Sequence, residues 1–275
     1  MTFGPIVDVA WLRAHLRLPD LRLVDCRWKL GQPGAGRQAY LAGHISGAAF
    51  LDLDTDLSDP PGERGRHPLP ERERFEAAVR AAGISPSTRV VAYDEAGEGA
   101  AARLWWLLGH FGHEAVAVLD GGGAAWRTAG GELVPGDERP PPGDFAAAVR
   151  EGDTANAGEI ADGVDLTLID ARAPERYAGR AEPIDPAAGH IPGARNVPFG
   201  ELAPGGSYLP ADQLRERLEQ AGATAGGEFV AYCGSGVSAC TLMLAADLAG
   251  LRARLYPGSW SEWCARGGPV ETGTD

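Results

Sequence analysis

The chain has 275 residues, of which 44% are hydrophobic and 23% are charged, and its formal net charge is −13. This length suggests two domains or one large one, and either can bury a core without disulfide or metal support. The acidic balance argues against general binding to nucleic acids or anionic membranes, which needs a basic face. The sequence contains no apolar run of the ~20 residues that span a bilayer and no signal-peptide pattern at its start.

Short apolar segments alternate with helical stretches along the chain, and the whole order occurs twice. In the first half the segments are LRLVDCR (21–27), AGHISGAAFLDL (42–53), VVAY (90–93) and a helical stretch that ends at Gly112. In the second half they are LTLIDAR (166–172), AGHIPGARNVPF (188–199), FVAY (229–232) and a helical stretch that ends at Gly250. Matching blocks in the same order indicate a duplicated domain.

The repeated order of strand, helix and strand predicts the fold class. It favours an α/β protein with two tandem units, each a parallel sheet flanked by helices. The segment PGDERPPPGD (135–144) is rich in proline, glycine and charge, as interdomain linkers are. We therefore expect domains over residues 1–135 and 154–275, joined by a linker over 136–153.

A cysteine distinguishes the second half from the first. FVAY is followed by Cys233 and by Gly-Ser-Gly-Val-Ser-Ala, which leads into a helix. A thiol at the carboxyl end of a parallel strand lies where open α/β folds bind ligands, and the positive helix end favours the thiolate. The first half has Asp94 at this place, so we expect that domain to be catalytically inactive. The alternative is that Cys233 is simply a small buried residue at a helix start.

The other cysteines, Cys26, Cys240 and Cys264, lack such a glycine-lined loop and are expected to serve packing. The four cysteines form no CxxC pair and no zinc-like spacing, so we expect no metal site. Free thiols also favour a reduced, cytoplasmic location.

These motifs resemble those of the rhodanese family. The loop CGSGVSA (233–239) closely resembles CGSGVTA, the active-site loop of the mercaptopyruvate sulfurtransferases within that family, and GHISGA, GHIPGA and YPGSWSEW resemble further family motifs. The resemblance covers both halves and implies tandem rhodanese domains with a degenerate first domain. It also implies a persulfide on Cys233 and no metal or organic cofactor.

The resemblance further implies which residues hold the substrate. In DARAPERYAG (170–179) the matching arginine for the donor's anionic group is Arg176, because a guanidinium suits a carboxylate or sulfonate. The simpler alternative is an ion pair of Arg176 with a nearby glutamate. Family members carry a second arginine in an EPEPR-like segment, where this chain reads EPIDP (182–186), so Arg180 and Arg195 are the candidates to replace it.

Within the loop, the resemblance implies that four residues contact the donor and that backbone N–H groups stabilise the anionic sulfur; these residues are Gly234, Gly236, Val237 and Ser238. The segment DLDTDLSDPPGERGRHPLP (52–70) resembles the family segment that supplies an aspartate and a histidine next to the loop serine. The matching residues are Asp54, His67 and Ser235, a relay that would move the thiol proton of the donor. Without the match, His67 in a loop rich in proline and glycine is more often solvated.

We therefore predict an enzyme that transfers a sulfane sulfur by double displacement, from 3-mercaptopyruvate to cyanide, a small thiol or thioredoxin. Family members specialised for thiosulfate carry cations in the loop, as in C-R-K-G, where this chain has neutral residues. The alternatives are a thiosulfate sulfurtransferase and a non-catalytic sulfur carrier or interaction module. A cysteine-dependent phosphatase is disfavoured, because the arginine that such loops need six residues after the cysteine is Ala239 here. We expect neither a nucleic acid nor a membrane partner.

Overall fold

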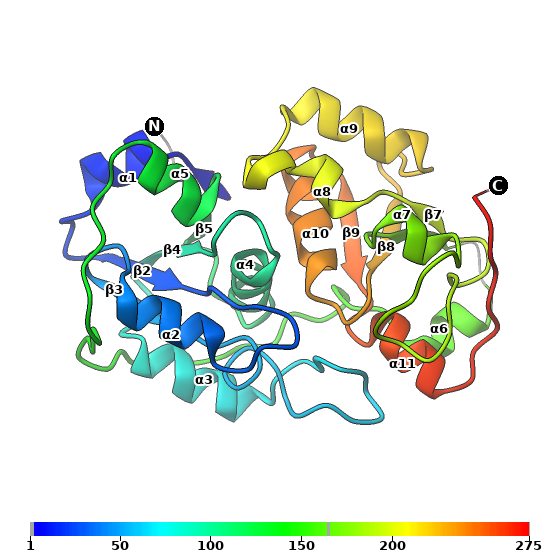
Figure 1. Cartoon of the computed structure of the whole chain (residues 1–275), viewed down its shortest axis with the longest axis horizontal. Helices are drawn as coiled ribbons and strands as arrows, with labels where there is room; N and C mark the ends of the chain where they lie inside the picture. Colours follow the sequence, from blue (N-terminus) through cyan, green and yellow to red (C-terminus); the bar gives the residue numbers. More distant parts are fainter. Residues whose placement is uncertain (1–2, 164–165, 275) are drawn as a thin grey trace. The chain divides into compact units, whose positions relative to one another are not determined.

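The computed structural model describes residues 3–163 and 166–274. Its contacts divide the chain into two compact units, which Figure 1 shows as two sheets with their helices. The first unit comprises residues 1–59, 70–150 and 205–207, and the second comprises residues 60–69, 151–204 and 208–275.

The first unit is built on a parallel sheet of five strands in the order β1-β5-β4-β2-β3. The strands are β1 (Ile6–Val7), β2 (Leu21–Asp25), β3 (Ala48–Phe50), β4 (Arg89–Tyr93) and β5 (Val116–Leu119). The helices that flank this sheet are α1 (Val9–His15), α2 (Ala35–Ala42), α3 (Arg72–Ala81), α4 (Ala100–His110) and α5 (Gly122–Thr128). Strand β4 is buried along nearly its whole length, as expected for a parallel sheet with both faces covered.

The second unit repeats this topology with four strands in the order β7-β6-β8-β9. The strands are β6 (Thr167–Asp170), β7 (Arg195–Asn196), β8 (Glu228–Tyr232) and β9 (Arg252–Leu255). An isolated parallel bridge from Thr154 to Leu255 stands beside β9, where β1 stands beside β5 in the first unit. The helices are α6 (Ala157–Ala161), α7 (Pro174–Tyr177), α8 (Phe199–Leu202), α9 (Ala211–Gln220), α10 (Ser238–Leu248) and α11 (Ser259–Ala265). The predicted pair of parallel α/β units is confirmed.

Equivalent helices close the core in both units. In the first unit, Trp11 of α1 and Trp126 of α5 are buried against the sheet residue Val91. In the second unit, Ile160 of α6 and Trp260 of α11 are buried in the same way against strand β8. The short first helix of each unit begins at a side-chain cap, Asp8 in α1 and Asn156 in α6, which accepts backbone N–H groups of the first turn.

The same buried ion pair follows the sheet in both units. Arg27 pairs with Asp25 at 2.7 Å, and Arg172 pairs with Asp170 at 2.6 Å. Each guanidinium also donates to the glycine carbonyl of the Gly-His-Ile motif, at 2.7 and 2.6 Å. The histidine of each motif stacks on a tyrosine ring, with centroids 4.1 and 3.8 Å apart. The arginine and the stacked histidine anchor the Gly-His-Ile turn in each unit. The buried guanidinium is stable there because it is paired with an aspartate.

Two short segments group with one unit although their neighbours in sequence belong to the other. Residues 60–69, from the first repeat, group with the second unit, and residues 205–207 group with the first. The expected linker contributes too, since residues up to Arg150 belong to the first unit. The sequence repeats give no sign that these two segments group with the other unit.

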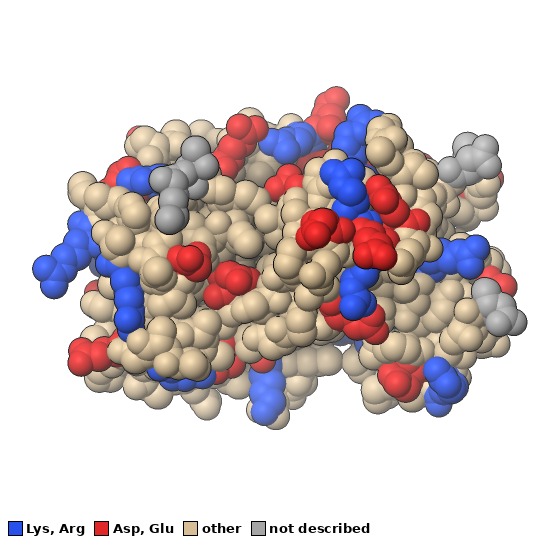
Figure 2. Space-filling view, turned by 90° about the horizontal axis from the view of Figure 1, so that it is seen from above, with Lys and Arg blue, Asp and Glu red and all other residues tan. Residues whose placement is uncertain are grey.

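The described helices include none that is both long and apolar enough to cross a membrane. On the face shown in Figure 2, lysine and arginine side chains lie among aspartate and glutamate side chains.

Candidate active site

Cys233 begins the loop that joins β8 to α10, and its side chain is buried, with 2% of the residue exposed. The backbone N–H of Gly236 donates to Cys233 Sγ at 3.1 Å. Gly236 has φ +77°, and a Cβ atom there would lie 2.4 Å from the carbonyl oxygen of Pro257. Only glycine therefore lets the loop turn back over the sulfur. A backbone donor aimed at sulfur stabilises negative charge on it.

Ser259 holds the backbone of Cys233 and was not singled out by the sequence. The N–H of Cys233 donates to Ser259 Oγ at 3.1 Å, and that hydroxyl donates to the carbonyl of Tyr256 at 2.9 Å. Ser259 has φ 52° and is the one non-glycine residue with positive φ in the described part of the chain. The matching residue of the first repeat is Gly122, with φ +59°. A strained residue costs about 1–3 kcal/mol, so its hydroxyl contacts must compensate for the strain.

Ser235 and His67 meet beside the loop, although they are far apart in sequence. Ser235 Oγ and His67 Nδ1 lie 2.7 Å apart, and both residues are buried. His67 lies in residues 60–69, which group with the second unit, as Ser235 does. Asp54, the third member of the predicted relay, lies in the first unit, in the turn that follows β3, where its N–H donates to Asp52 Oδ1 at 2.8 Å. Its role in a relay stays a prediction.

Two guanidinium groups lie beside Gly234. Arg176 of α7 pairs with Glu182 at 2.8 Å and with Asp185 at 2.9 Å. Arg66 pairs with the same Asp185 at 2.7 Å. A Cβ atom at Gly234 would lie 3.1 Å from Arg66 Nη2 and 3.4 Å from Arg176 Nη1. Burial raises the pKa of Glu182, but the hydrogen bond and charge of Arg176, together with the backbone N–H groups of Asp185 and Ile184, hold that pKa below its usual value.

The predicted substitutes for a second substrate arginine are placed differently. Arg180 and Arg195 are both exposed, whereas Arg66 is only partly exposed. No local motif singles out Arg66, because its ion-pair partner Asp185 is 119 residues away in the chain. The remaining loop residues that we predicted, Val237 and Ser238, lie at the start of α10. Their backbone N–H groups lie at the N-terminal, positive end of this helix, which suits an anion.

In the first unit, Asp94 fills the loop that corresponds to the Cys233 loop. Its carboxylate accepts the backbone N–H groups of Gly97, Gly99 and Ala101 at 2.7, 3.1 and 3.2 Å. Burial raises the pKa of Asp94, and its backbone hydrogen bonds act against this shift. The anion-binding loop of the first unit is thus occupied by its own side chain.

We expect Asp94→Ala to lower the free energy of unfolding of the first unit by about 2–4 kcal/mol, because buried N–H groups lose their acceptor. Urea unfolding, followed by tryptophan fluorescence, measures this loss. The matched control is Asp20→Ala in the same unit, which removes an exposed ion pair with Arg89 and should cost less than about 1 kcal/mol. Equal losses for the two variants would contradict the role given to Asp94.

The remaining thiols are suited to packing. Burial, with a contribution from the charge of Asp25, raises the pKa of Cys26 well above its usual value. Burial raises the pKa of Cys264 to about 11. The Sγ of Cys240 donates to the carbonyl of Gly236 at 3.3 Å and so supports the loop from the helix side. Cys26 and Cys264 are therefore protonated at neutral pH and are poor nucleophiles.

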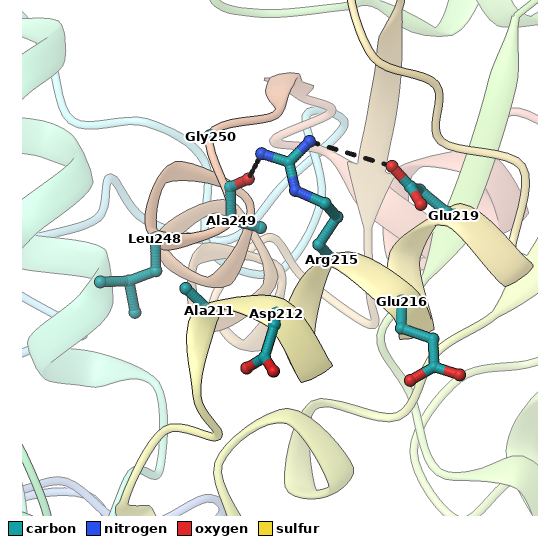
Figure 3. A pocket seen from close by; sticks show the side chains of 8 residues that line it. All are labelled: Ala211, Asp212, Arg215, Glu216, Glu219, Leu248, Ala249 and Gly250. Carbon is teal, nitrogen blue, oxygen red and sulfur yellow. Dashed lines mark hydrogen bonds and ion pairs between the residues drawn. The ribbon is translucent and has the colours of Figure 1, made fainter.

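A separate pocket of about 480 Å³ lies at the far end of α10 (Figure 3). Arg215 of α9 donates to the carbonyl of Ala249 there and pairs with Glu219 at 3.9 Å. This arginine caps the C-terminus of α10, where backbone carbonyls lack helical partners. Asp212 and Glu216 add further negative charge to the lining. This pocket therefore lies at the C-terminal end of α10, and Cys233 does not line it.

A family model described as "Rhodanese-like domain" matches residues 8–129 and 154–266. A probable 3-mercaptopyruvate sulfurtransferase of Pseudomonas aeruginosa is 43% identical over 96% of both chains. A putative thiosulfate sulfurtransferase of Mycobacterium tuberculosis is 45% identical over 94% of this chain and 93% of its own. The crystal structure of the 3-mercaptopyruvate sulfurtransferase SseA from Escherichia coli matches with a TM-score of 0.83 and 33% identity, over 94% of this chain and 99% of that one.

The chain belongs to the rhodanese family, with one family domain in each repeat. The chain is a sulfurtransferase, as are these relatives, which it matches over nearly their full length.

Proposed function

We propose that this protein moves a sulfane sulfur from 3-mercaptopyruvate to a thiophilic acceptor through a persulfide on Cys233. The observation that carries the proposal is the N–H of Gly236, which points at Cys233 Sγ from 3.1 Å in a buried loop at a helix start. This environment suits a thiolate before the reaction and an anionic persulfide after it. The first repeat has a carboxylate at the same place, so we assign catalysis to the second repeat alone.

In the first half-reaction, the Cys233 thiolate attacks the sulfur of the donor. The carbon–sulfur bond breaks, its electron pair stays on carbon, and pyruvate forms once this carbon takes up a proton. The proton leaves the donor thiol, and we assign its movement to Ser235 and His67, whose side-chain atoms lie 2.7 Å apart. We propose Asp54 as the group that orients His67.

In the second half-reaction, cyanide, a small thiol or thioredoxin attacks the outer sulfur of the persulfide. The sulfur–sulfur bond breaks and returns the Cys233 thiolate, so the enzyme turns over without a metal or an organic cofactor. We place this chemistry in the cytoplasm, because the four cysteines are all free thiols.

The donor's carboxylate is assigned to Arg176, and its reacting sulfur to the backbone groups of Gly234, Gly236, Val237 and Ser238. Arg176 is partly exposed, with 17% of its side chain accessible, and points its guanidinium toward Gly234. A planar guanidinium binds a carboxylate through two parallel hydrogen bonds. The ion pairs of Arg176 with Glu182 and Asp185 hold it in place but also compete with the donor.

Thiosulfate is the alternative donor, since relatives with either name match this chain closely. Arg66 and Arg176 carry two positive charges beside the loop, and Glu182 and Asp185 carry two negative ones. A dianion such as thiosulfate therefore meets no net positive charge beside the loop. A carboxylate carries only one negative charge that the site must compensate. One cation at ~4 Å from an anion contributes up to ~4 kcal/mol at an effective dielectric of ~20.

We expect kcat/KM for mercaptopyruvate to exceed that for thiosulfate at least tenfold, because about a third of this Coulomb energy already gives such a ratio. Steady-state kinetics with both donors and one shared acceptor measures the ratio. Equal or better efficiency with thiosulfate would identify a thiosulfate sulfurtransferase. A single uptake of sulfur without turnover would identify a sulfur carrier instead.

A further inference from the structure

A pocket of about 240 Å³ lies in the first unit, at the start of strand β2. Arg17 and Arg22 line it, together with Ser46 and Gly47 from the turn before β3. Strands β2 and β4 are parallel, and Asp94 follows the carboxyl end of β4. The pocket therefore lies at the edge of the sheet opposite the Asp94 loop. Pockets for drug-sized ligands measure ~300–1,000 Å³, so this one suits a smaller molecule.

The two guanidinium groups of this pocket lack partners in the described part of the chain. Neither Arg17 nor Arg22 makes a side-chain hydrogen bond or ion pair there, and Arg22 Nε is buried without an acceptor. The nearby carboxylate of Asp20 pairs instead with Arg89 at 2.8 Å. No carboxylate is among the described residues that line the pocket. Because a buried donor without an acceptor is costly, a ligand that accepts from Arg22 removes that cost.

The rest of the lining is largely apolar. Leu16, Leu18 and Pro19 come from the segment after α1, and Leu21 and Leu23 come from β2. Leu21 and Leu23 are buried members of the core of the first unit. Guanidinium groups beside leucine side chains suit a ligand that combines an anionic group with a small apolar body.

The second repeat shows that the fold does not need these polar groups. Three residues before the paired aspartate of each unit, the first repeat has Arg22 and the second has Thr167. Where GHISGA has Ser46, GHIPGA has Pro192, which offers neither a hydroxyl nor an N–H. Both units nevertheless form the same parallel strands at these places. The arginine and the serine therefore call for a reason other than folding.

We infer that the first unit binds a small phosphate monoester in this pocket. Arg17, Arg22 and the hydroxyl of Ser46 hold the phosphoryl group, and the leucine side chains contact the organic part. A phosphate monoester carries about −1.5 to −2 charge at neutral pH, which matches two guanidinium groups, whereas a carboxylate carries one negative charge. A guanidinium also donates to phosphate through two parallel hydrogen bonds. The unit that lacks the catalytic cysteine thus has a binding role of its own.

The test is isothermal titration of the full chain with phenyl phosphate. We expect one molecule to bind in this pocket, and we expect Arg22→Thr, which introduces the residue of the second repeat, to raise Kd at least about tenfold. Arg17→Met should raise Kd in the same direction. Inorganic phosphate, which lacks the ring, and benzoate, which carries a single charge, should each bind at least about tenfold more weakly than phenyl phosphate.

Arg176→Met is the matched control, because it removes a guanidinium beside the Cys233 loop and should leave this Kd within about twofold of the wild type. Sulfur transfer by Arg22→Thr should likewise stay within about twofold. Absence of binding to the wild type, or binding that is lost in Arg176→Met and kept in Arg22→Thr, would overturn the inference. Equal affinity for benzoate would overturn the assignment to a phosphate monoester. If Arg22→Thr does not fold, the Kd of Arg17→Met, which alters an exposed residue, decides the question.

Discussion

Replacing Cys233 with serine should abolish sulfur transfer, with kcat lowered by at least about 10⁴-fold, because a hydroxyl is not ionised at neutral pH and carries no persulfide. The substitution changes one atom in a residue that is 2% exposed, so the fold should be retained. Steady-state turnover with mercaptopyruvate and cyanide measures the loss, and circular dichroism checks the fold.

Cys240→Ser is the matched control, because Cys240 supports the same loop through its bond to the Gly236 carbonyl. We expect it to keep most of its turnover, and Cys26→Ser to lose stability alone, because Cys26 is completely buried. Substantial turnover by Cys233→Ser would move the nucleophile to another residue.

A fragment of residues 154–275 contains Cys233 but lacks the segment 60–69, which belongs to the same compact unit. We expect its kcat/KM to fall at least about 100-fold, because Ser235 loses its partner His67. General acid–base catalysis typically contributes 10²–10⁴-fold. Arg66 is lost with the same segment. Kinetics of the fragment and of the full chain under identical conditions measure the effect.

His67→Ala in the full chain separates the chemistry from folding. We expect it to reproduce a loss of at least about 100-fold in kcat while the chain keeps its unfolding transition. Full activity in a folded fragment would remove residues 60–69 from the mechanism. Full activity in His67→Ala would remove the proton relay but leave the loop around Cys233 in place.

The architecture could be predicted because its signals are local and occur twice. VVAY and FVAY became the buried strands β4 and β8, and each is followed by an apolar helix, α4 or α10. The position of Cys233 also follows from local sequence, since strand, cysteine and glycine loop are contiguous. Asp94 could be recognised as its counterpart because the repeats align.

The rest of the site depends on contacts between distant parts of the chain. Ser235 and His67 are 168 residues apart, and their pairing was predicted only through the family resemblance. Arg66 and Ser261 are 195 residues apart and were not predicted at all. Arg180 and Arg195, the candidates to replace the second arginine of the family motif, are both exposed, and their role stays a prediction. Ser259 could have been noticed as a serine at the place where the first repeat has Gly122.

The central claim is that Cys233 accepts the sulfur and passes it on. Intact-mass spectrometry after addition of mercaptopyruvate, without acceptor, tests this directly. We predict that the wild type gains the mass of one sulfur atom, that cyanide removes it, and that Cys233→Ser gains none. Absence of the added mass in the wild type, or its presence in Cys233→Ser, would contradict the persulfide mechanism.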